Sequence, residues 1–489
     1  MSPQSGFQSP PGNIIIAWND IYLKVVRGIG GAPGPLARMG ALMHLAMYEA
    51  VNRLMPGSAG YPNTLADGEI LDESGAVLQP GLATEVPATC AAYAACFALA
   101  ALLKDYVAAS RKAQGGVGSP FDPFQVVPDA ADHSPALLLT PANGPAEVAA
   151  LAYGQAIAKA LLKQRETDST VGLDMTVLPD LEIKPGEWRD TGSGPALTPN
   201  WGKVPLFLLK HEEHPTAGYH PTDIGDGLLN YKALLASPMY AAQMREVKRL
   251  GEVRSADRTA EQTEIAFFWA NDLNGTSKPP GQLYTITQVV AKQQSTLADL
   301  LETARLFAMV GTAMVNASIV AWHVKYFNPE TAPPLRLWRP ETAIQRAAED
   351  DNPATTADPD WQPLSAMLSG TRFSPNFPAY VSGHSTFGAA HAAAMKAFYH
   401  TDNIAFTATT EDPHAAHDAN GIRRTRSFTS FTQAALENGR SRVYLGVHYQ
   451  FDASGGYEIG TKVGEDTAKW FSAKPVPAGT AAAIANHAK

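Results

Sequence analysis

The chain has 489 residues, of which 45% are hydrophobic and 17% are charged, and its formal net charge is -9. This composition is that of a globular protein able to bury a large core. The acidic balance and the lack of a basic stripe exclude a general nucleic-acid-binding protein. Two cysteines, Cys90 and Cys96, lie six residues apart in a helical run. Because this spacing does not place them on one helix face, we expect no disulfide between them.

The first twelve residues are polar and rich in Ser, Pro and Gly. They lack the charged and long apolar regions of a secretory signal, so we expect either a protein that is not exported or a mature form. From residue 13 onward, apolar periodicity predicts helices almost throughout. The expected helices cover residues 13–29, 36–54, 86–103, 145–167, 225–250, 255–269, 306–324 and 389–398, and helices resume at residue 428.

Residues 86–103 and 306–324 are apolar enough to resemble membrane spans. The second run contains Gly311, Thr312 and Asn316, and nothing flanks it as an anchor. We therefore expect both runs to be central helices of a soluble bundle, with no membrane partner.

Two segments between the helices are irregular. Residues 172–209 are rich in Gly, Pro and Trp, and we expect a loop that covers the bundle and shapes the site entrance. The alternative is a flexible interdomain linker, against which Trp188, Trp201 and Phe207 favour packing. Residues 345–369 are polar and contain prolines, so we expect an exposed connection.

Some histidines and methionines have the residue types of metal ligands. His44, between Met43 and Met47, lies in a helical run where core packing is the better interpretation. His414 and His417 are expected to be solvated, since nothing nearby in the sequence completes a metal site.

Residues 441–452 read SRVYLGVHYQFD. If a helix begins near Val447, His448 and Asp452 lie four residues apart on one face of it, and Arg442 comes from the preceding turn. A guanidinium offers a fixed fork of donors, and a neutral imidazole offers a nucleophile or a metal ligand. This pattern suits a tetrahedral oxyanion, although a surface Arg and a core His would look the same.

Residues 374–388 contain Ser382, Gly383 and His384, directly before an Ala-rich run that we expect to be helical. Free N–H groups and the positive end of the helix dipole favour an anion at a helix N-terminus. Gly lets the backbone approach a ligand closely, and His384 can exchange a proton with it. The alternative is an ordinary Ser cap with an incidental His.

A third motif is formed by Lys325, which ends a long apolar run, and by Arg339 with Pro340, which open the next element. Together, the K…RP, SGH and SR-x5-H-x3-D motifs resemble the signature of the type 2 phosphatidic acid phosphatase and vanadium-dependent haloperoxidase superfamily. Residues 17–52 also resemble the opening of bacterial vanadium-haloperoxidase-like proteins. One departure is Val381, which stands where the family usually has Pro.

The second departure is the spacing of Lys325 and Arg339, which is fourteen residues here and wider than is usual in the family. Residues 328–335 look like an insertion, so Arg336 is an alternative donor for the first basic position. Trp322 stands three residues before Lys325, as in the fungal chloroperoxidases, and favours Lys325.

The resemblance implies an all-α fold of two packed helical bundles, with the oxyanion site inside the C-terminal bundle. We place the first bundle and its covering loop at residues 1–250 and the catalytic bundle at residues 251–489. By the same resemblance, His448 binds vanadium(V) through a ring nitrogen, while His384 moves protons. The vanadate oxygens are held by five residues, namely Lys325, Arg339, Ser382, Gly383 and Arg442, and phosphate is expected to occupy the same site.

Three further residues follow from the resemblance. Residues 268–281 resemble a family segment in which a carboxylate pairs with the arginine of the last motif, so Asp272 is expected to hold Arg442; the alternative is a simple loop cap. Trp322 and Phe377 match the aromatic pair near the halide site of the fungal chloroperoxidases, with core packing as the alternative. A buried aromatic pair would exclude water from the halide.

The sequence favours a haloperoxidase that uses hydrogen peroxide to oxidise a halide, with bromide or chloride as candidates, and that halogenates an organic acceptor. The alternative is a soluble acid phosphatase in which His448 attacks phosphorus and His384 protonates the leaving alcohol. A third hypothesis is a non-catalytic oxyanion binder, against which the intact His384 counts. Halide preference, organic acceptor, compartment and oligomeric state stay open, and a homo-oligomer is compatible with the sequence.

Overall fold

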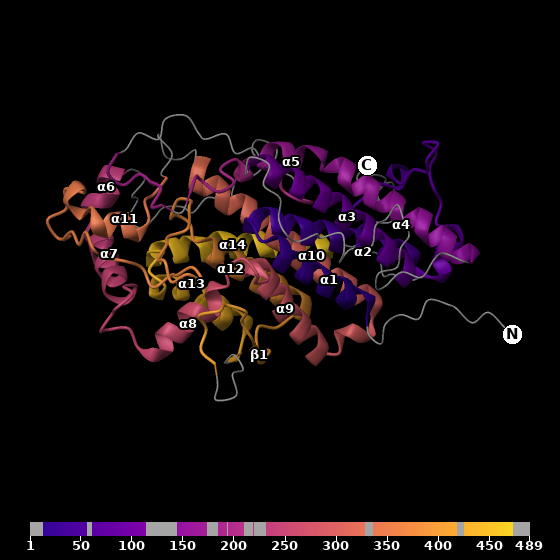
Figure 1. Ribbon diagram of the computed structural model, residues 1–489. Coiled ribbons are helices and arrows are strands. Elements are labelled where there is room, and N and C mark those ends of the chain that lie inside the picture. The colour runs from indigo at the N-terminus through magenta and orange to yellow at the C-terminus, as the bar shows by residue number, and fades with distance from the viewer. Residues whose placement is uncertain are drawn as a thin grey trace, which may run out of the picture.

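The computed structural model describes residues 13–55, 61–113, 144–173, 184–192, 194–209, 219, 231–327, 336–417 and 425–472. The N-terminal segment 1–12, the expected insertion at 328–335 and the first residues of the helix expected at 225–250 lie outside these ranges. Within them the fold is all-α, as predicted from the sequence (Figure 1).

The first half of the chain forms long helices with clear start signals. The Asn13 side chain caps α1 by accepting a hydrogen bond from the N–H of Ile15 at 2.9 Å. Proline stands in the first turn of α2 and α4, where its missing N–H costs nothing. The helices are α1 (Ile14–Ile29), α2 (Pro33–Leu54), α3 (Pro87–Ala113), α4 (Pro145–Gln164) and α5 (Glu166–Gly172), with short 3₁₀ turns at Asp67–Glu69, Gly81–Glu85 and Trp201–Lys203.

The second half supplies the remaining helices and one pair of short strands. The helices are α6 (Tyr231–Ala236), α7 (Pro238–Leu250), α8 (Ala260–Ala270), α9 (Lys278–Gln293), α10 (Leu300–Phe327), α11 (Pro340–Gln345), α12 (Gly383–Tyr399), α13 (Phe431–Tyr444) and α14 (Gln450–Ser472). The strands are β1 (Phe406–Ala408) and β2 (Arg426–Phe428), and 3₁₀ turns lie at Thr296–Ala298 and Ala347–Glu349.

Helix α10 is the common core element. It packs against α2, which itself packs on α3, and also against α12 and α14, which pack on each other and on α13 (Figure 1). Two helices, Pro87–Tyr106 and Leu300–Phe327, are long and apolar enough to cross a membrane by length and composition. In their most apolar windows 72% and 100% of the residues are buried inside the protein, which is typical of core helices.

The segment at 184–209 lies close against α10. Trp188, Trp201 and Phe207 are all buried, and the indole Nε1 of Trp201 donates to Ser318 Oγ at 2.8 Å. A Cβ on Gly202 would lie 2.3 Å from the backbone N of His323, so only glycine permits this approach. The segment is therefore packed against the helices, which excludes a flexible linker over these residues.

Two expectations about the second half were wrong. The first is the connection at 345–369, which is not uniformly exposed: Trp361 is buried, and its Nε1 donates to Lys248 O at 2.9 Å. The second concerns β1 and β2, which pair antiparallel in a region where no strand was expected, with Phe406 opposite Phe428. Their rings lie 5.3 Å apart, so a local aromatic contact fixes this pair.

Candidate active site

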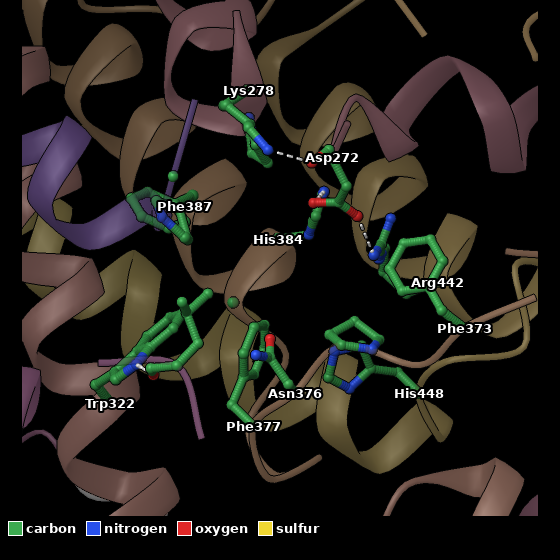
Figure 2. A pocket seen from close by; sticks show the side chains of 16 residues that line it. Asp272, Lys278, Trp322, Phe373, Asn376, Phe377, His384, Phe387, Arg442 and His448 are labelled. Carbon is green, nitrogen blue, oxygen red and sulfur yellow. Dashed lines mark hydrogen bonds and ion pairs between the residues drawn. The ribbon is translucent and has the colours of Figure 1, made fainter. Parts of the chain in front are cut away.

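A cavity of about 110 Å³ lies where the three motifs meet, and Figure 2 shows Asp272, His384, Arg442 and His448 arranged around one space. Its wall combines ionisable groups with aromatic rings, and in Figure 2 Trp322, Phe377 and Phe387 lie away from Arg442. The lining residues are Gly31, Pro33, Leu197, Asp272, Lys278, Pro279, Trp322, Phe373, Pro375, Asn376, Phe377, Gly383, His384, Phe387, Arg442 and His448. The ionisable groups all come from the second half of the chain, while Gly31, Pro33 and Leu197 extend the wall from the first half.

His448 has both ring nitrogens assigned by its neighbours. Its Nε2 lies 3.0 Å from Arg339 Nη1 and must accept there, because a guanidinium can only donate. The ring proton is therefore on Nδ1, which donates to Asp452 Oδ2 at 2.7 Å. Burial, followed by the charges of Arg339, Lys325 and Arg442, lowers the pKa of His448 well below its usual value. The imidazole is neutral, and the lone pair on its Nε2 accepts from Arg339.

The backbone around His448 differs from the expected helix start. Helix α13 runs to Tyr444 and includes Arg442 in its last turn, and α14 begins only at Gln450. The cause is Gly446, whose φ of 82° ends α13 and whose missing Cβ leaves room for Gly251 O, 2.5 Å from where a Cβ would be. His448 consequently lies in the turn between two helices, while Asp452 lies in the first turn of α14.

Two buried arginines present nitrogen atoms without partners. Arg339 Nε donates to Phe377 O at 2.7 Å and Nη1 to Val447 O at 2.8 Å, but Nη2 has no partner. Arg442 Nη2 donates to Asp272 Oδ2 at 2.7 Å, while its Nε and Nη1 have none. A buried charged donor without an acceptor is costly, so these three nitrogens favour an anion with several oxygens. The donor set fits vanadate or phosphate.

The N-terminus of α12 adds backbone donors to the same region. Ser382 is the N-cap of this helix, and its side chain accepts from Ser385 N at 3.4 Å. Gly383 follows it and lines the cavity, where a Cβ would project to within 3.5 Å of Trp322. This arrangement agrees with the helix start expected at Ser382 and Gly383, and the positive end of α12 favours an anion there.

His384 contacts both the cavity and Asp272. Its Nε2 donates to Ala270 O at 3.0 Å and lies 3.7 Å from Asp272 Oδ1, which leaves Nδ1 as the acceptor nitrogen. Burial and the nearby Arg442 lower the pKa of His384 to about 4, although Asp272 opposes this. The neutral ring can take a proton from a ligand in the cavity. In the ion pair between Asp272 and Arg442, the Asp272 side chain is half-buried, while the Arg442 side chain is only 1% exposed.

Comparisons with known proteins locate the family in the second half of the chain. Residues 305–474 match the family described as the VCPO second helical-bundle domain. A vanadium chloroperoxidase of Curvularia inaequalis is 32% identical over 246 residues, which cover 42% of this chain and 39% of that protein. The second half of the chain is therefore similar to vanadium haloperoxidases over the helical-bundle domain at residues 305–474. The chain spans less than two-fifths of the length of the fungal relative that it matches.

Solved structures of haloperoxidases share the fold over nearly the whole chain. A bacterial vanadium-dependent iodoperoxidase has a TM-score of 0.63 at 21% identity and covers 96% of this chain and 98% of its own. A holo-type bacterial vanadium-dependent chloroperoxidase has a TM-score of 0.60 at 14% identity, covering 91% and 94%. At these identities the likeness establishes the fold alone.

The first basic position of the haloperoxidase motif has two candidates that lie in different surroundings. Lys325 is fully buried in the last turn of α10, and its Nζ donates to Pro378 O at 2.6 Å and Ala379 O at 3.0 Å. Arg336 forms an ion pair with Glu187 at 3.2 Å, on the side of the covering segment. Lys325, Arg339 and Ser382 are not among the residues that line the cavity. The charges of Lys325 and Arg339 both lower the pKa of His448, so Lys325 is the candidate on the side of the oxyanion donors.

The aromatic pair expected from the sequence, Trp322 and Phe377, lines the cavity. Trp322 and Phe377 have ring centroids 5.0 Å apart, and both line it. Lys325 Nζ lies 5.1 Å from the Phe377 ring centre, close enough for a cation–π contact. Phe373, beside Arg442 in Figure 2, and Phe387 also line the cavity and had not been predicted, because single phenylalanines carry no site signal.

Lys278 is a charged cavity residue that sequence reasoning missed. It has φ of 59°, is 7% exposed, and donates through Nζ to the carbonyl oxygen of Asp272 (Figure 2). Burial lowers its pKa to about 8, although the charge of Asp272 opposes this. Its position before two prolines could have been noticed, but nothing in the sequence indicates that a lysine at a helix start turns inward.

The residues set aside as non-ligands differ in their surroundings: His417 is exposed, whereas His414, which was expected to be solvated, is partly buried, with Nε2 3.2 Å from Met367 O and its ring 5.4 Å from that of Phe267. His44 is buried, its Nε2 lies 3.2 Å from Asn19 Oδ1, and it packs against Tyr284 and Phe307. Cys90 and Cys96 are free and buried. Over the described part of the chain, no group of three or more His, Cys, Asp or Glu side chains is arranged to hold a metal cation. The candidate site therefore suits an oxyanion held by cations and one imidazole.

Proposed function

We propose that this protein is a vanadium-dependent haloperoxidase, which uses hydrogen peroxide to oxidise bromide, and also chloride, to hypohalous acid that halogenates organic acceptors. The observation that carries the proposal is the set of three buried, unpartnered guanidinium nitrogens beside a neutral His448. These groups need an anion with several oxygens, and the lone pair on His448 Nε2 provides a ligand for its central atom.

The residues would divide the cofactor between them. His448 would hold vanadium through Nε2, after Arg339 Nη1 turns from that nitrogen to an oxygen of the anion. The vanadate oxygens would be held by the side chains of Lys325, Arg339, Ser382 and Arg442 and by the N–H of Gly383. Vanadate, once bound, supplies a Lewis-acid centre that polarises hydrogen peroxide toward attack by halide.

The remaining steps belong to the protein. His384 takes a proton from the incoming peroxide at Nδ1 and returns it when water leaves, because its low pKa keeps this nitrogen free at neutral pH. Asp272 holds Arg442 so that its free nitrogens stay directed at the anion. Trp322 and Phe377 give the halide an apolar wall where it loses competing hydration.

A second candidate function is phosphate-ester hydrolysis. The observation in its favour is the His448–Asp452 pair, since an imidazole held at Nδ1 by a carboxylate is also a good nucleophile at Nε2. Phosphate would then occupy the same donors, and His384 would protonate the leaving alcohol. The aromatic wall and the vanadium-dependent relatives favour the haloperoxidase. A non-catalytic anion binder would have no use for the proton-accepting nitrogen of His384.

We also propose that the chain divides near residue 250 into two bundles that act together. All of the ionisable groups in the proposed site come from residues 251–489, and the first bundle closes the cavity through Gly31, Pro33 and Leu197.

The test is to load metal-free protein with orthovanadate and to measure bromide and chloride oxidation by hydrogen peroxide beside hydrolysis of a phosphate ester. The proposal expects bromide oxidation that depends on added vanadate. Phosphate-ester hydrolysis without any halide oxidation would establish the alternative. Full halide oxidation in protein shown to lack vanadium would contradict both.

A further inference from the structure

The 271–278 loop runs from the end of α8 to the first residue of α9, and it carries Asp272 near one end and Lys278 at the other. Three of its residues have positive φ: Asn271 at 42°, Gly275 at 91° and Lys278 at 59°. The left-handed region is disfavoured for residues with a Cβ, so Asn271 and Lys278 need support from their surroundings. Asn271 Nδ2 donates to Lys278 O at 3.2 Å, which closes the loop on itself.

Two neighbouring carboxylates, which follow β1 in the chain, hold the two ends of this loop from outside. Ser277 N donates to Glu411 Oε2 at 2.8 Å. Asp412 accepts from His414 N at 2.9 Å and lies near the other end of the loop, where the backbone N–H of Asn271 lowers its pKa. Carboxylates accept backbone N–H groups strongly because the hydrogen bond is assisted by charge. The position of the loop is therefore fixed by residues more than 130 positions away.

Glu411 is in turn held by the first helix of the chain. Arg27, in the last turn of α1, donates from Nε to Glu411 Oε2 at 2.9 Å and from Nη2 to Oε1 at 2.7 Å. This bidentate geometry fixes the carboxylate in direction as well as position. Next to it, a Cβ on Gly30 would lie 2.4 Å from Asn274 Oδ1, so the turn after α1 packs directly on the loop.

We propose that Glu411 is a positioning residue for the oxyanion site, and that the Arg27–Glu411 pair links the first bundle to oxyanion affinity. Glu411 holds Ser277, the loop then holds Asp272, and Asp272 directs Arg442 into the cavity. Asp412 performs the same task at the other end of the loop. The inference rests on the proposed oxyanion site and deepens it, since it assigns control of affinity to residues that do not touch the anion. If Glu411 were only a surface ion pair, its removal would leave affinity unchanged.

The first experiment is calorimetric titration of Glu411→Gln with vanadate and, separately, with phosphate. Glutamine keeps the length of the side chain but removes its charge and its bidentate pairing with Arg27. We expect both dissociation constants to rise about tenfold, the lower end of the range for groups that orient a ligand-binding residue. Glu411→Asp, which keeps the charge, should recover part of the loss. The matched control is Glu349→Gln, because Glu349 is also a glutamate paired with arginine, Arg189 at 2.7 Å and Arg346 at 3.0 Å, away from the loop.

The second experiment is a double-mutant cycle with Asp272→Asn, read by the same titrations. If Glu411 acts through Asp272, Glu411→Gln should have little further effect once Asp272 has lost its charge. Additive losses would overturn the inference, as would unchanged affinity in Glu411→Gln or an equal loss in the Glu349→Gln control. If the unsubstituted protein bound neither oxyanion, the proposed function would fail first, and this inference with it.

Discussion

Asp452 accepts a hydrogen bond from Nδ1 of His448 at 2.7 Å, and both side chains are buried. This contact joins the turn after α13 to the first turn of α14 and decides which nitrogen of His448 faces Arg339. Tyr449 N also donates to the same oxygen at 3.1 Å, so the carboxylate is fixed by the backbone as well. This carboxylate and Arg339 Nη1, which donates to Nε2 at 3.0 Å, together assign Nε2 as the nitrogen that we propose as the vanadium ligand.

Asp452→Asn should therefore weaken vanadate binding by roughly ten- to a hundredfold. An amide can turn its NH₂ toward His448 Nδ1, which would move the ring proton to Nε2 and remove the lone pair from the cavity. Vanadate titration measures the change, and Asp257→Asn is a control because Asp257 is exposed and pairs only loosely with Arg249, at 3.6 Å. Equal affinity in both variants would contradict the assignment.

His448→Ala and His384→Ala should fail in different ways. The first removes the proposed vanadium ligand, so tight vanadate binding should be lost. The second should keep most of the binding but lower turnover by roughly a hundredfold or more, because it removes proton transfer. Titration and a bromide-oxidation assay on the same preparations separate the two effects. If both variants lose binding equally, the proposed division of roles is wrong.

Lys278→Gln should raise the KM for bromide by roughly tenfold with a smaller effect on vanadate affinity. The ammonium adds a positive charge to the cavity wall, and in a partly desolvated site such a charge attracts an anion by one to a few kcal/mol. Glutamine, like lysine, has a Cβ, so a positive φ is equally unfavourable for both residues. The substitution therefore removes the charge without changing the conformational strain of the backbone. If the KM for bromide were unchanged while vanadate affinity fell, the role of Lys278 would be only to hold the 271–278 loop in place.

Asp412 should make stability depend on pH. Burial raises its pKa from 3.8 to about 6, although the N–H groups of His414 and Asn271 oppose the shift. The folded state therefore binds more protons than the unfolded state between about pH 4 and pH 6, so this carboxyl lowers stability as pH rises through that range. The full effect is at most ~3 kcal/mol.

The Asp412→Asn variant has no titratable group at this position. Across this pH range, its melting temperature should therefore rise relative to that of the unsubstituted protein as pH rises. A constant difference between their melting temperatures from pH 4 to pH 7 would contradict the raised pKa.

The three motifs and most helices could be predicted from sequence because their signals are local. The cap at Ser382 and the apolar run ending at Lys325 each depend on neighbours within one or two turns. The start of α14 was misplaced because Gly446 could continue or end a helix, and only its close approach to Gly251 decides which. The distant contacts had no such signal: neither the Glu411–Ser277 hydrogen bond nor the inward turn of Lys278 has a pattern in the nearby residues.

The cavity wall has a practical consequence for protein engineering. Gly31 and Pro33 precede the second bundle by more than two hundred residues, yet they face the same space as His384 and Arg442. If residues 251–489 were expressed alone, the cavity would be open to solvent, and the side of α10 that packs on α2 would be exposed. A chimera that takes its first bundle from a relative should therefore be designed around the Arg27–Glu411 contact and the turn that follows α1, rather than around a cut site chosen for sequence similarity.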